Sequence, residues 1–360
     1  MKRILFSLIL AGISFLMGAQ TPTTPNIVYT EASDLTLTGK LMNTPNPYHR
    51  VDTVKFKGFT TSENNQVRNS AGIGVAFRTN AKNISILTEY GDVGYPNNTG
   101  GFSARGYDLY IKKDGKWIWA GAGVPGDLKK PFNVISNMDG TMKECLLYLP
   151  ILSEEYSVKI GVNEGSVLEA IPNPFRYRIG IFGSSFTHGI STSRAGMAYP
   201  AIFSRDTGLQ LLSLGCSGNC KLQSYFADVL AAAEVDAFIF DPFSNPSIEQ
   251  IEERLFPFIE KVQAAHPGKP LIFQRTIYRE WRNFDKNRDK AEADRIAVAD
   301  SLMKIACKKY KDVYYIHPSA TAKDHETTQD GIHPSDQGYQ LWAESIEKPV
   351  MKILRKYGIK

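Results

Sequence analysis

The chain has 360 residues, of which 42% are hydrophobic and 22% are charged. This is the composition of an ordinary globular protein, so it excludes a disordered chain, a collagen and a coiled coil. Length alone favours two domains. The formal net charge is only +5 and no basic block is present, which argues against nucleic acid or an anionic membrane surface as a partner.

Residues 1–19 have the layout of a secretory signal peptide. Lys2 and Arg3 precede an apolar run that ends at the small residues Gly18 and Ala19. The alternative is an uncleaved anchor helix, but the run is short for a span of about 20 residues, and no second apolar segment follows. We therefore expect cleavage after Ala19 and an exported, periplasmic or secreted protein without stable membrane insertion.

Four cysteines are too few for a disulfide framework in a chain of this length. Cys216 and Cys220 lie close enough in sequence for a bridge, which export would permit. A metal site is the weaker alternative, since no paired Cys or His spacing accompanies them. Buried free thiols are the reading we favour.

Residues 26–173 predict an all-β region. Short runs rich in Val, Ile, Thr, Tyr and Phe alternate with Gly, Pro, Asn and Asp clusters, and no convincing helical pattern interrupts them. The Asp114-Gly115 pair between two such runs predicts a tight hairpin. The expected strands are 27–30, 54–59, 74–77, 84–88, 107–111, 117–120, 144–149 and 156–160. About eight short strands predict a β-sandwich of jelly-roll type.

Residues 176–360 have a different periodicity. Short apolar runs at 178–182, 209–214, 237–240, 270–274 and 313–316 suit strands that are buried on both faces. Helical patterns lie between or after them at 248–265, 289–307 and 341–354. This alternation predicts an α/β fold, a parallel sheet in a three-layer α/β/α arrangement. Ligands bind such sheets at the carboxyl ends of the strands.

The first of these strands runs directly into residues 183–189, Gly-Ser-Ser-Phe-Thr-His-Gly. A strand that ends in Gly-x-Ser can present a serine nucleophile at a strand-to-helix turn, with backbone amides facing a developing oxyanion. Ser185 is therefore the candidate nucleophile. The alternative is that this segment is a turn without a catalytic role.

A serine nucleophile needs an imidazole base, which in turn needs a carboxylate on its other nitrogen. Asp330 stands three residues before His333, and no other histidine has an acid at that offset. The alternative is a surface turn before the last helix. We expect no metal site, since His317, His325 and His333 are spaced eight residues apart and share no helical face.

Polar donors follow the second and third predicted strands. Gly218 could offer a backbone N–H and Asn245 a side-chain amide. Either segment alone would be read as a turn. Ser, Gly, Asn and an Asp/His pair follow one another in this order on one parallel sheet. This combination is a far more specific sign of a catalytic site than any one of the motifs alone.

This order resembles that of the SGNH (GDSL-type) serine hydrolases, whose four blocks carry Ser, Gly, Asn and His. The resemblance implies Ser185 as nucleophile, His333 as general base and Asp330 as its orienting acid. It also implies an oxyanion hole made by the N–H groups of Ser185 and Gly218 and the amide of Asn245. Ser184 stands where the family name has Asp, and the third block reads Asp-Pro-Phe-Ser-Asn.

The sequences of three segments resemble those of one exported bacterial branch of that superfamily: 196–200, 214–219 and 330–334. In this branch, a β-rich domain with a Gly-x-Asp-Leu-Tyr signature precedes the hydrolase domain. The signature stands here at residues 106–110. The resemblance thus covers nearly the whole mature chain, as a β accessory domain (26–173) and an SGNH hydrolase domain (176–360).

Four further residues are candidates for substrate binding: His188, Arg275, Arg279 and Trp281. His188 follows Ser185 by three residues, and the others follow the fourth strand at the edge where substrate should lie. Each could instead pack or solvate a loop. Trp117 and Trp119 on the β region could stack on sugar rings or belong to its core.

The resemblance implies a secreted serine esterase without metal or other cofactor. Export, the lack of a long apolar lid and an aromatic-bearing β domain favour O-acetyl groups on carbohydrate as substrate. The alternatives are a lipid or phospholipid acylhydrolase and a non-catalytic glycan-binding protein.

Overall fold

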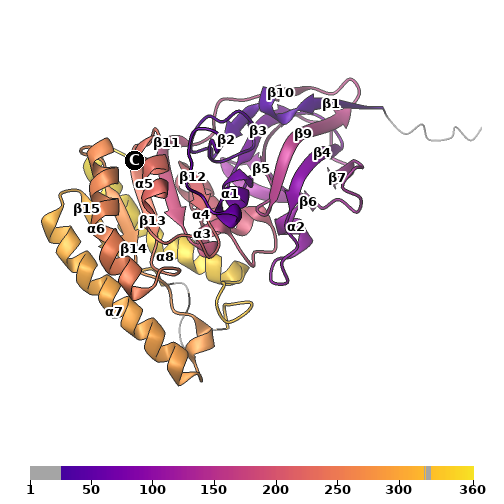
Figure 1. The fold of residues 1–360 in the computed structure, drawn as a ribbon. Coiled ribbons are helices and arrows are strands. Elements are labelled where there is room, and N and C mark those ends of the chain that lie inside the picture. The colour runs from indigo at the N-terminus through magenta and orange to yellow at the C-terminus, as the bar shows by residue number, and fades with distance from the viewer. Residues whose placement is uncertain (1–25, 320, 322–325) are drawn as a thin grey trace, which may run out of the picture.

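The computed structural model describes residues 26–319, 321 and 326–360, so the predicted signal peptide at 1–19 lies outside the described residues. Two regions of different architecture follow one another along the chain (Figure 1). Strands of the first region, 26–173, pair antiparallel, and those of the second region, 176–360, pair parallel. Within the described part of the chain, no helix is long and apolar enough to cross a bilayer.

The first region is a two-sheet β structure. One sheet has the order β1-β9-β4-β7, and the other has the order β10-β3-β8-β5-β6 with β2 paired to β3. Inward residues of both sheets, such as Ile86 and Leu147, form one buried apolar cluster. The predicted β-sandwich is confirmed. Its strands are β1 (Ile27–Glu31), β2 (Thr36–Thr38), β3 (Gly74–Thr79), β4 (Ile84–Val93), β5 (Tyr107–Lys113), β6 (Lys116–Gly123), β7 (Phe132–Ile135), β8 (Lys143–Tyr148), β9 (Ser153–Asn163) and β10 (Leu168–Ala170).

Several details of the first region differ from the sequence-based prediction, which did not include β2, β7, β10 or the short helix at Gly101–Ala104. The run 54–59 is not a strand, because the Asp52 carboxylate accepts the N–H groups of Val54 and Lys55 and closes a local turn. The helix α1 (Thr61–Arg68) was not expected, since its sequence is polar and carries no apolar stripe. A capping box between Thr60 and Glu63 begins it instead.

The second region contains one parallel sheet of order β12-β11-β13-β14-β15. Its strands are β11 (Arg176–Gly183), β12 (Leu209–Gly215), β13 (Ala237–Asp241), β14 (Leu271–Gln274) and β15 (Val313–Ile316). Its helices are α3 (Ser185–His188), α4 (Tyr199–Thr207), α5 (Ser224–Ala231), α6 (Ile248–Ala265), α7 (Lys286–Lys309) and α8 (Asp336–Leu354). The predicted α/β fold is confirmed.

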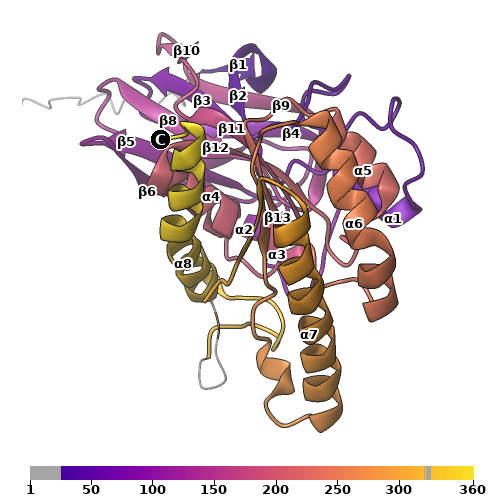
Figure 2. The ribbon, with the colours of Figure 1, turned by 90° about the vertical axis from the view of Figure 1, so that its left-hand side faces the viewer.

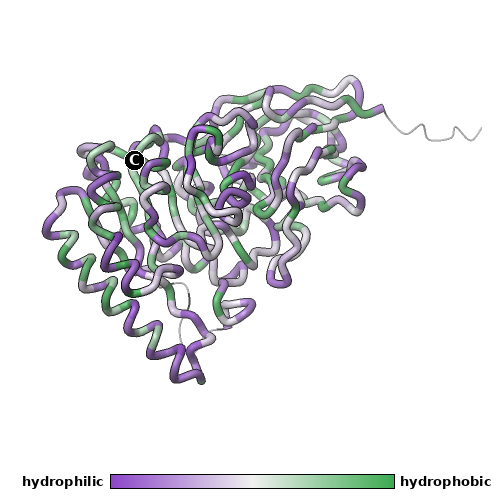
Figure 3. The backbone as a smooth tube through the Cα atoms, in the orientation of Figure 1, coloured by the Kyte–Doolittle hydropathy of each residue, from purple (hydrophilic) through white to green (hydrophobic). Residues whose placement is uncertain are grey.

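Both faces of the parallel sheet are covered, as the unbroken apolar runs require. Neighbouring residues of β11 enter opposite clusters: Ile181 packs with Trp342 of α8, and Phe182 packs with Ile259 of α6. Figure 2 shows α8 on one side of the strands and α6 and α7 on the other. Hydrophobic segments run along the strands, while α7 alternates between hydrophobic and hydrophilic along its length (Figure 3). The layers are therefore α/β/α.

The signature motif of the first region fastens it to the second. The buried Asp108 carboxylate accepts the N–H of Gly196 at 2.9 Å and the Nε1–H of Trp119 at 3.0 Å, and it pairs with Arg194 at 3.2 Å. Gly196 must be glycine, because a Cβ there would lie 2.6 Å from the Asp108 carboxylate. Trp119 is thus half-exposed but committed to this junction.

Candidate active site

Ser185 lies where β11, an interior strand of the parallel sheet, turns into a helix. It is the first residue of α3, directly after β11 and the capping residue Ser184. Asp241, the last residue of the adjacent β13, accepts hydrogen bonds from the Ser184 hydroxyl at 2.8 Å and the Ser184 N–H at 3.2 Å. Burial raises the pKa of Asp241 to about 6, against the lowering effect of those bonds. Asp241 therefore holds the residue that directly precedes Ser185.

His333 and Asp330 meet Ser185 in a continuous hydrogen-bond chain. His333 Nε2 lies 2.9 Å from Ser185 Oγ, and His333 Nδ1 lies 2.7 Å from Asp330 Oδ2. The Phe186 ring packs against the imidazole in an edge-to-face arrangement, with the ring centroids 5.7 Å apart. Both His333 and Asp330 belong to the loop that precedes α8, far from Ser185 in sequence. The structure thus brings the three predicted residues together in the order Ser–His–Asp.

The Asp330 carboxylate is held by several donors. Its Oδ1 accepts the N–H groups of Ile332 and His333, and its Oδ2 accepts the His333 ring and the side chain of Asn98. Partial burial alone would raise its pKa, but the bonds from His333 and Asn98 lower the pKa of Asp330 to about 2. The carboxylate is therefore ionised across the physiological range.

Gly218 and Asn245 follow β12 and β13, the two strands that flank β11 in the sheet. Their loops consequently emerge at the same edge as Ser185. Gly218 adopts φ +71°, a left-handed backbone conformation that favours glycine. The Asn245 side-chain oxygen accepts the N–H of Cys220 at 3.3 Å, which leaves its NH₂ group as the part that can donate to a ligand.

An open groove of about 790 Å³ lies over this edge, and both regions line it. His333 and Ser217 come from the second region, while α1 and the loop after β4 come from the first. Tyr95 contributes an exposed aromatic ring. Uncharged polar side chains dominate the lining: Ser62, Asn65, Gln66, Asn69, Asn98 and Ser217.

Sequence reasoning missed the residues that the first region contributes to this site. Gln66 Nε2 donates to the carbonyl oxygen of Ser217 at 3.0 Å, and Asn98 Nδ2 donates to Asp330 Oδ2 at 2.9 Å. Single amides in a polar helix and a loop carry no sequence signal. Asp241 could have been noticed, since it ends a buried strand and precedes a proline.

His188 does not reach the groove, contrary to the sequence-based expectation. Its side chain is buried beneath the first region, where Nε2 donates to the carbonyl oxygen of Ile151 at 2.7 Å. Burial, with the nearby Arg50 charge, lowers the pKa of His188 to about 3. It is therefore a neutral packing residue that joins α3 to the first region.

The three other candidates also lie outside the groove lining. Arg275 pairs with Asp300 of α7 at 3.0 Å, beside a separate small cavity. Arg279 is buried, pairs with Glu292 of α7 at 3.0 Å, and donates to the carbonyl oxygen of Ser244 at 3.2 Å. Through its bond to Ser244, Arg279 stabilises the loop that carries Asn245.

Trp281 supports the Asp330–His333 loop in the same indirect way. Its N–H donates to the carbonyl oxygen of Gly331 at 2.8 Å, and its indole Nε1 donates to Glu292 at 3.2 Å. A Cβ on Gly331 would lie 3.0 Å from the Trp281 Cβ. The segment that precedes α7 therefore packs against the Asp330–His333 loop.

The four cysteines are free thiols, and Cys145, Cys216 and Cys220 are buried. Cys216 and Cys220 therefore do not form a disulfide in this structure. Burial raises the pKa of both thiols, so they stay protonated. Among residues 26–319, 321 and 326–360, no cluster of three or more His, Cys, Asp or Glu side chains has the geometry for a metal ion.

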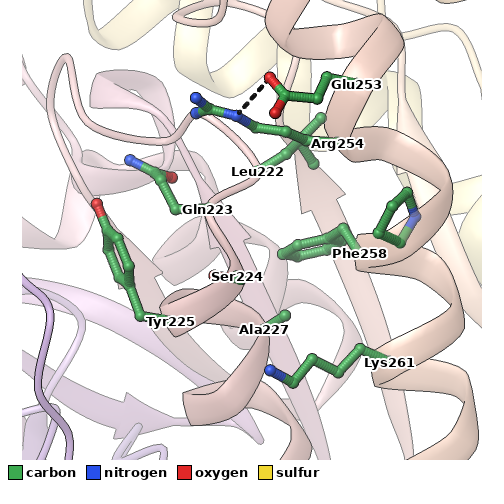
Figure 4. Close-up of a pocket in the computed structure, with 10 residues that line it drawn as sticks. Leu222, Gln223, Ser224, Tyr225, Ala227, Glu253, Arg254, Phe258 and Lys261 are labelled. Atoms are coloured by element: carbon green, nitrogen blue, oxygen red, sulfur yellow. Dashed lines mark ion pairs between the residues drawn. The ribbon is translucent and has the colours of Figure 1, made fainter.

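A second cavity, of about 620 Å³, lies between α5 and α6, away from Ser185 (Figure 4). Leu222, Ala227 and Phe258 form its apolar wall. Figure 4 shows Arg254 and Glu253 paired at its rim, with Lys261 on the opposite end. None of the Ser185, His333 and Asp330 side chains lines this cavity.

A parallel α/β/α sheet with serine, histidine and aspartate in hydrogen-bond contact at its carboxyl edge defines a serine hydrolase. The model of the GDSL-like lipase/acylhydrolase family matches residues 176–352. A second model, GxDLY, the N-terminus of SGNH hydrolase-type esterases, matches residues 27–168. The chain belongs to this family of ester-hydrolysing enzymes, with the GxDLY domain in front.

One solved structure supports this assignment, and two more distant ones share the fold. A protein described as a GDSL-like lipase from Bacteroides ovatus is 37% identical, with a TM-score of 0.88 over 92% of this chain and 98% of that one. A salicylyl-acyltransferase from a tetracycline biosynthetic pathway is 17% identical, with a TM-score of 0.70 over 93% and 99%. A family two carbohydrate esterase from Cellvibrio japonicus is 10% identical, with a TM-score of 0.61 over 92% and 99%. A comparison with curated proteins gave no significant match.

Proposed function

We propose that this protein is a serine esterase that removes short acyl groups, acetyl above all, from carbohydrate. The observation that carries the proposal is the 2.9 Å contact between Ser185 Oγ and His333 Nε2, since His333 also lines a groove whose side chains are mostly polar. The contact supports an acyl-transfer reaction, and the polar lining supports a carbohydrate ester as the substrate.

In the proposed reaction, His333 takes the hydroxyl proton as Ser185 Oγ attacks the ester carbonyl carbon. Asp330 accepts the other ring N–H and stabilises the imidazolium that forms. The tetrahedral oxyanion is bound by the N–H groups of Ser185 and Gly218 and by the Asn245 amide. Collapse of this intermediate breaks the C–O bond, and His333 gives its proton to the leaving alcohol.

The acyl-enzyme is then hydrolysed by water. His333 removes a proton from the water, the new oxyanion uses the same donors, and the carboxylic acid leaves as Ser185 regains its proton. Every proton is returned, so the cycle needs no cofactor. The N–H of Ser185 suits the oxyanion because the first N–H groups of a helix have no acceptor within that helix.

Three observations support a carbohydrate ester. Amide and hydroxyl side chains such as Asn65, Gln66 and Asn69 can exchange hydrogen bonds with sugar hydroxyls. Tyr95, at the same groove, offers a ring face for stacking on a sugar. Family two carbohydrate esterases, one of them from Clostridium thermocellum solved with cellohexaose, share the fold over 92–94% of this chain.

The test is the rate of hydrolysis of p-nitrophenyl esters from acetate to decanoate, followed by acetate release from acetylated and deacetylated xylan. We expect the rate to peak at acetate and acetate to be released from acetylated xylan only. A peak at long chains would contradict the carbohydrate substrate and favour a lipid acylhydrolase. Binding of xylan without hydrolysis of any ester would contradict the enzyme and favour a glycan-binding protein.

We also propose that the protein is exported after removal of residues 1–19. The supporting observation is the order of Lys2 and Arg3, an apolar run, and small residues at Gly18 and Ala19. N-terminal sequencing of the protein from the periplasm or medium should begin at Gln20. An intact Met1 on protein recovered from the cytoplasm would contradict this.

A further inference from the structure

Asn98 reaches from the first region onto the catalytic pair of the second. It lies in the loop between β4 and the short helix α2 (Gly101–Ala104), 232 residues away in sequence from Asp330. Its Nδ2 is 2.9 Å from Asp330 Oδ2 and 3.4 Å from His333 Nδ1. Asp330 Oδ2 is the same oxygen that accepts the His333 ring.

The loop that carries Asn98 is fastened at several points, so this contact is built into the fold. The neighbouring Thr99 is buried, and its hydroxyl accepts the N–H of Ser191, close after α3, at 3.0 Å. Gly94 N–H donates to the Leu152 carbonyl oxygen at 2.8 Å at the other end of the loop. Asn98 is therefore presented to Asp330 by a braced segment.

We propose that Asn98 is a positioning residue of the triad, supplied by the first region, and that it acts through Asp330. This inference rests on the esterase mechanism proposed above. A carboxylate can rotate about its Cβ–Cγ bond, and the Asn98 donor fixes the Oδ2 atom in the direction of the imidazole. The first region thus completes the catalytic site rather than only binding substrate.

The chemistry of the amide decides which variants test this role. Asn98→Ala removes the donor, while Asn98→Asp keeps the shape and replaces the donor with a second carboxylate. We expect Asn98→Ala to lower kcat for p-nitrophenyl acetate about 10- to 100-fold, the effect of one hydrogen bond to a charged group, with KM nearly unchanged. Asn97→Ala is the matched control, since Asn97 is exposed and outside the groove lining.

The pH dependence of kcat in Asn98→Asp distinguishes a positioning role of Asn98 from a purely structural one. At pH 8 the introduced carboxylate repels Asp330, so kcat should fall below that of Asn98→Ala. Towards pH 5 the introduced carboxyl binds a proton and can donate again, and the gap should close. Other ionisable side chains around this point include Asp92, Tyr95 and Arg105 on the first region and Asp336 at the start of α8. All of them are unchanged in these variants.

A double-mutant cycle tests whether the effect passes through Asp330. In an Asp330→Ala background, Asn98→Ala should change kcat less than about threefold, because the acceptor is already gone. An equal loss in both backgrounds, or wild-type kcat in Asn98→Ala, would overturn the inference. So would Asn98→Ala and Asn97→Ala behaving alike.

The rate at which a fluorophosphonate modifies Ser185 measures triad reactivity without any ester substrate. The same variants should therefore be ranked by this rate as well. Fast labelling of the wild type without ester hydrolysis would overturn the proposed function, while the Asn98 ranking would still decide the inference. Normal hydrolysis by the wild type with no effect of Asn98 would overturn the inference alone.

Discussion

Gln66 of α1 donates a hydrogen bond from Nε2 to the carbonyl oxygen of Ser217, 3.0 Å away, in the loop that carries Gly218. The buried Arg50 guanidinium binds the same junction, with bonds of 2.9 Å to the carbonyl oxygens of Gly215 and Asn69. The first region therefore braces the loop after β12 as well as the Asp330–His333 pair. A backbone donor must be held in place before the oxyanion forms if it is to stabilise it.

Replacement of Gln66 should weaken catalysis through this loop. Gln66→Ala removes the neutral hydrogen bond to Ser217 and a longer one, of 3.4 Å, to Ser62 Oγ. We expect kcat for p-nitrophenyl acetate to fall roughly fivefold to tenfold. Asn64→Ala, on the same helix but outside the groove lining, is the control. Equal kcat in the two variants would show that α1 does not brace the loop.

Removal of the Asn245 amide should have a larger effect, because in the proposed mechanism this amide binds the oxyanion directly. We expect Asn245→Ala to lower kcat by about 10²- to 10³-fold with little change in KM. Asn219→Ala removes a nearby amide that bonds Ser62 and the Ser217 carbonyl oxygen instead, and should cost far less. A loss below tenfold in Asn245→Ala would remove Asn245 from the oxyanion hole.

His188 should make stability depend on pH. Its pKa is about 3 in the folded protein, against an ordinary 6.5, since burial and Arg50 disfavour the charged ring. Between these values the unfolded chain binds a proton that the folded one does not, so stability falls as pH drops below 6.5. From pH 7.5 to pH 5, the free energy of unfolding of the wild type should fall by about 2 kcal/mol more than that of His188→Gln. Parallel losses in denaturant titrations would contradict this.

Asp108 should stabilise the junction of the two regions. Asp108→Asn keeps the size of the side chain but weakens the pairing with Arg194 and places NH₂ hydrogens near existing donors. We expect a loss of about 1–3 kcal/mol in a thermal or denaturant transition, and faster proteolysis between the regions. Asp114→Asn, at the exposed tip of the β5–β6 hairpin, should lose less than about 0.5 kcal/mol. Equal stability of the two variants would contradict the role of Asp108.

Sequence periodicity predicted those elements whose burial repeats along the chain. α6 was expected at the bounds it has, because its apolar stripe is regular. α1 was missed because a capping box and contacts to the second region form it, and only Glu63 and Val67 are buried. The 54–59 run was misread because a side-chain turn at Asp52 outweighs its β-rich composition.

The site could be predicted where a local motif carries the chemistry. Ser185, Asp330 and His333 sit in short segments whose spacing is meaningful, and the fold joins those segments at one edge of the sheet. Asn98 and Gln66 could not be predicted, because their roles exist only through contacts across the two regions. His188 was misplaced since closeness to Ser185 in sequence does not say which way one turn of helix directs a side chain.

The central claim is that Ser185 carries the acyl group, and the rate of p-nitrophenyl acetate hydrolysis by wild type and Ser185→Ala tests it most directly. The account predicts a loss of about 10⁴-fold or more in kcat in Ser185→Ala, with a similar loss in His333→Ala and no further loss in the double variant, because the triad acts as a unit. Intact mass spectrometry should detect an acetyl adduct on the wild type only. Hydrolysis by Ser185→Ala within tenfold of the wild-type rate would contradict the account.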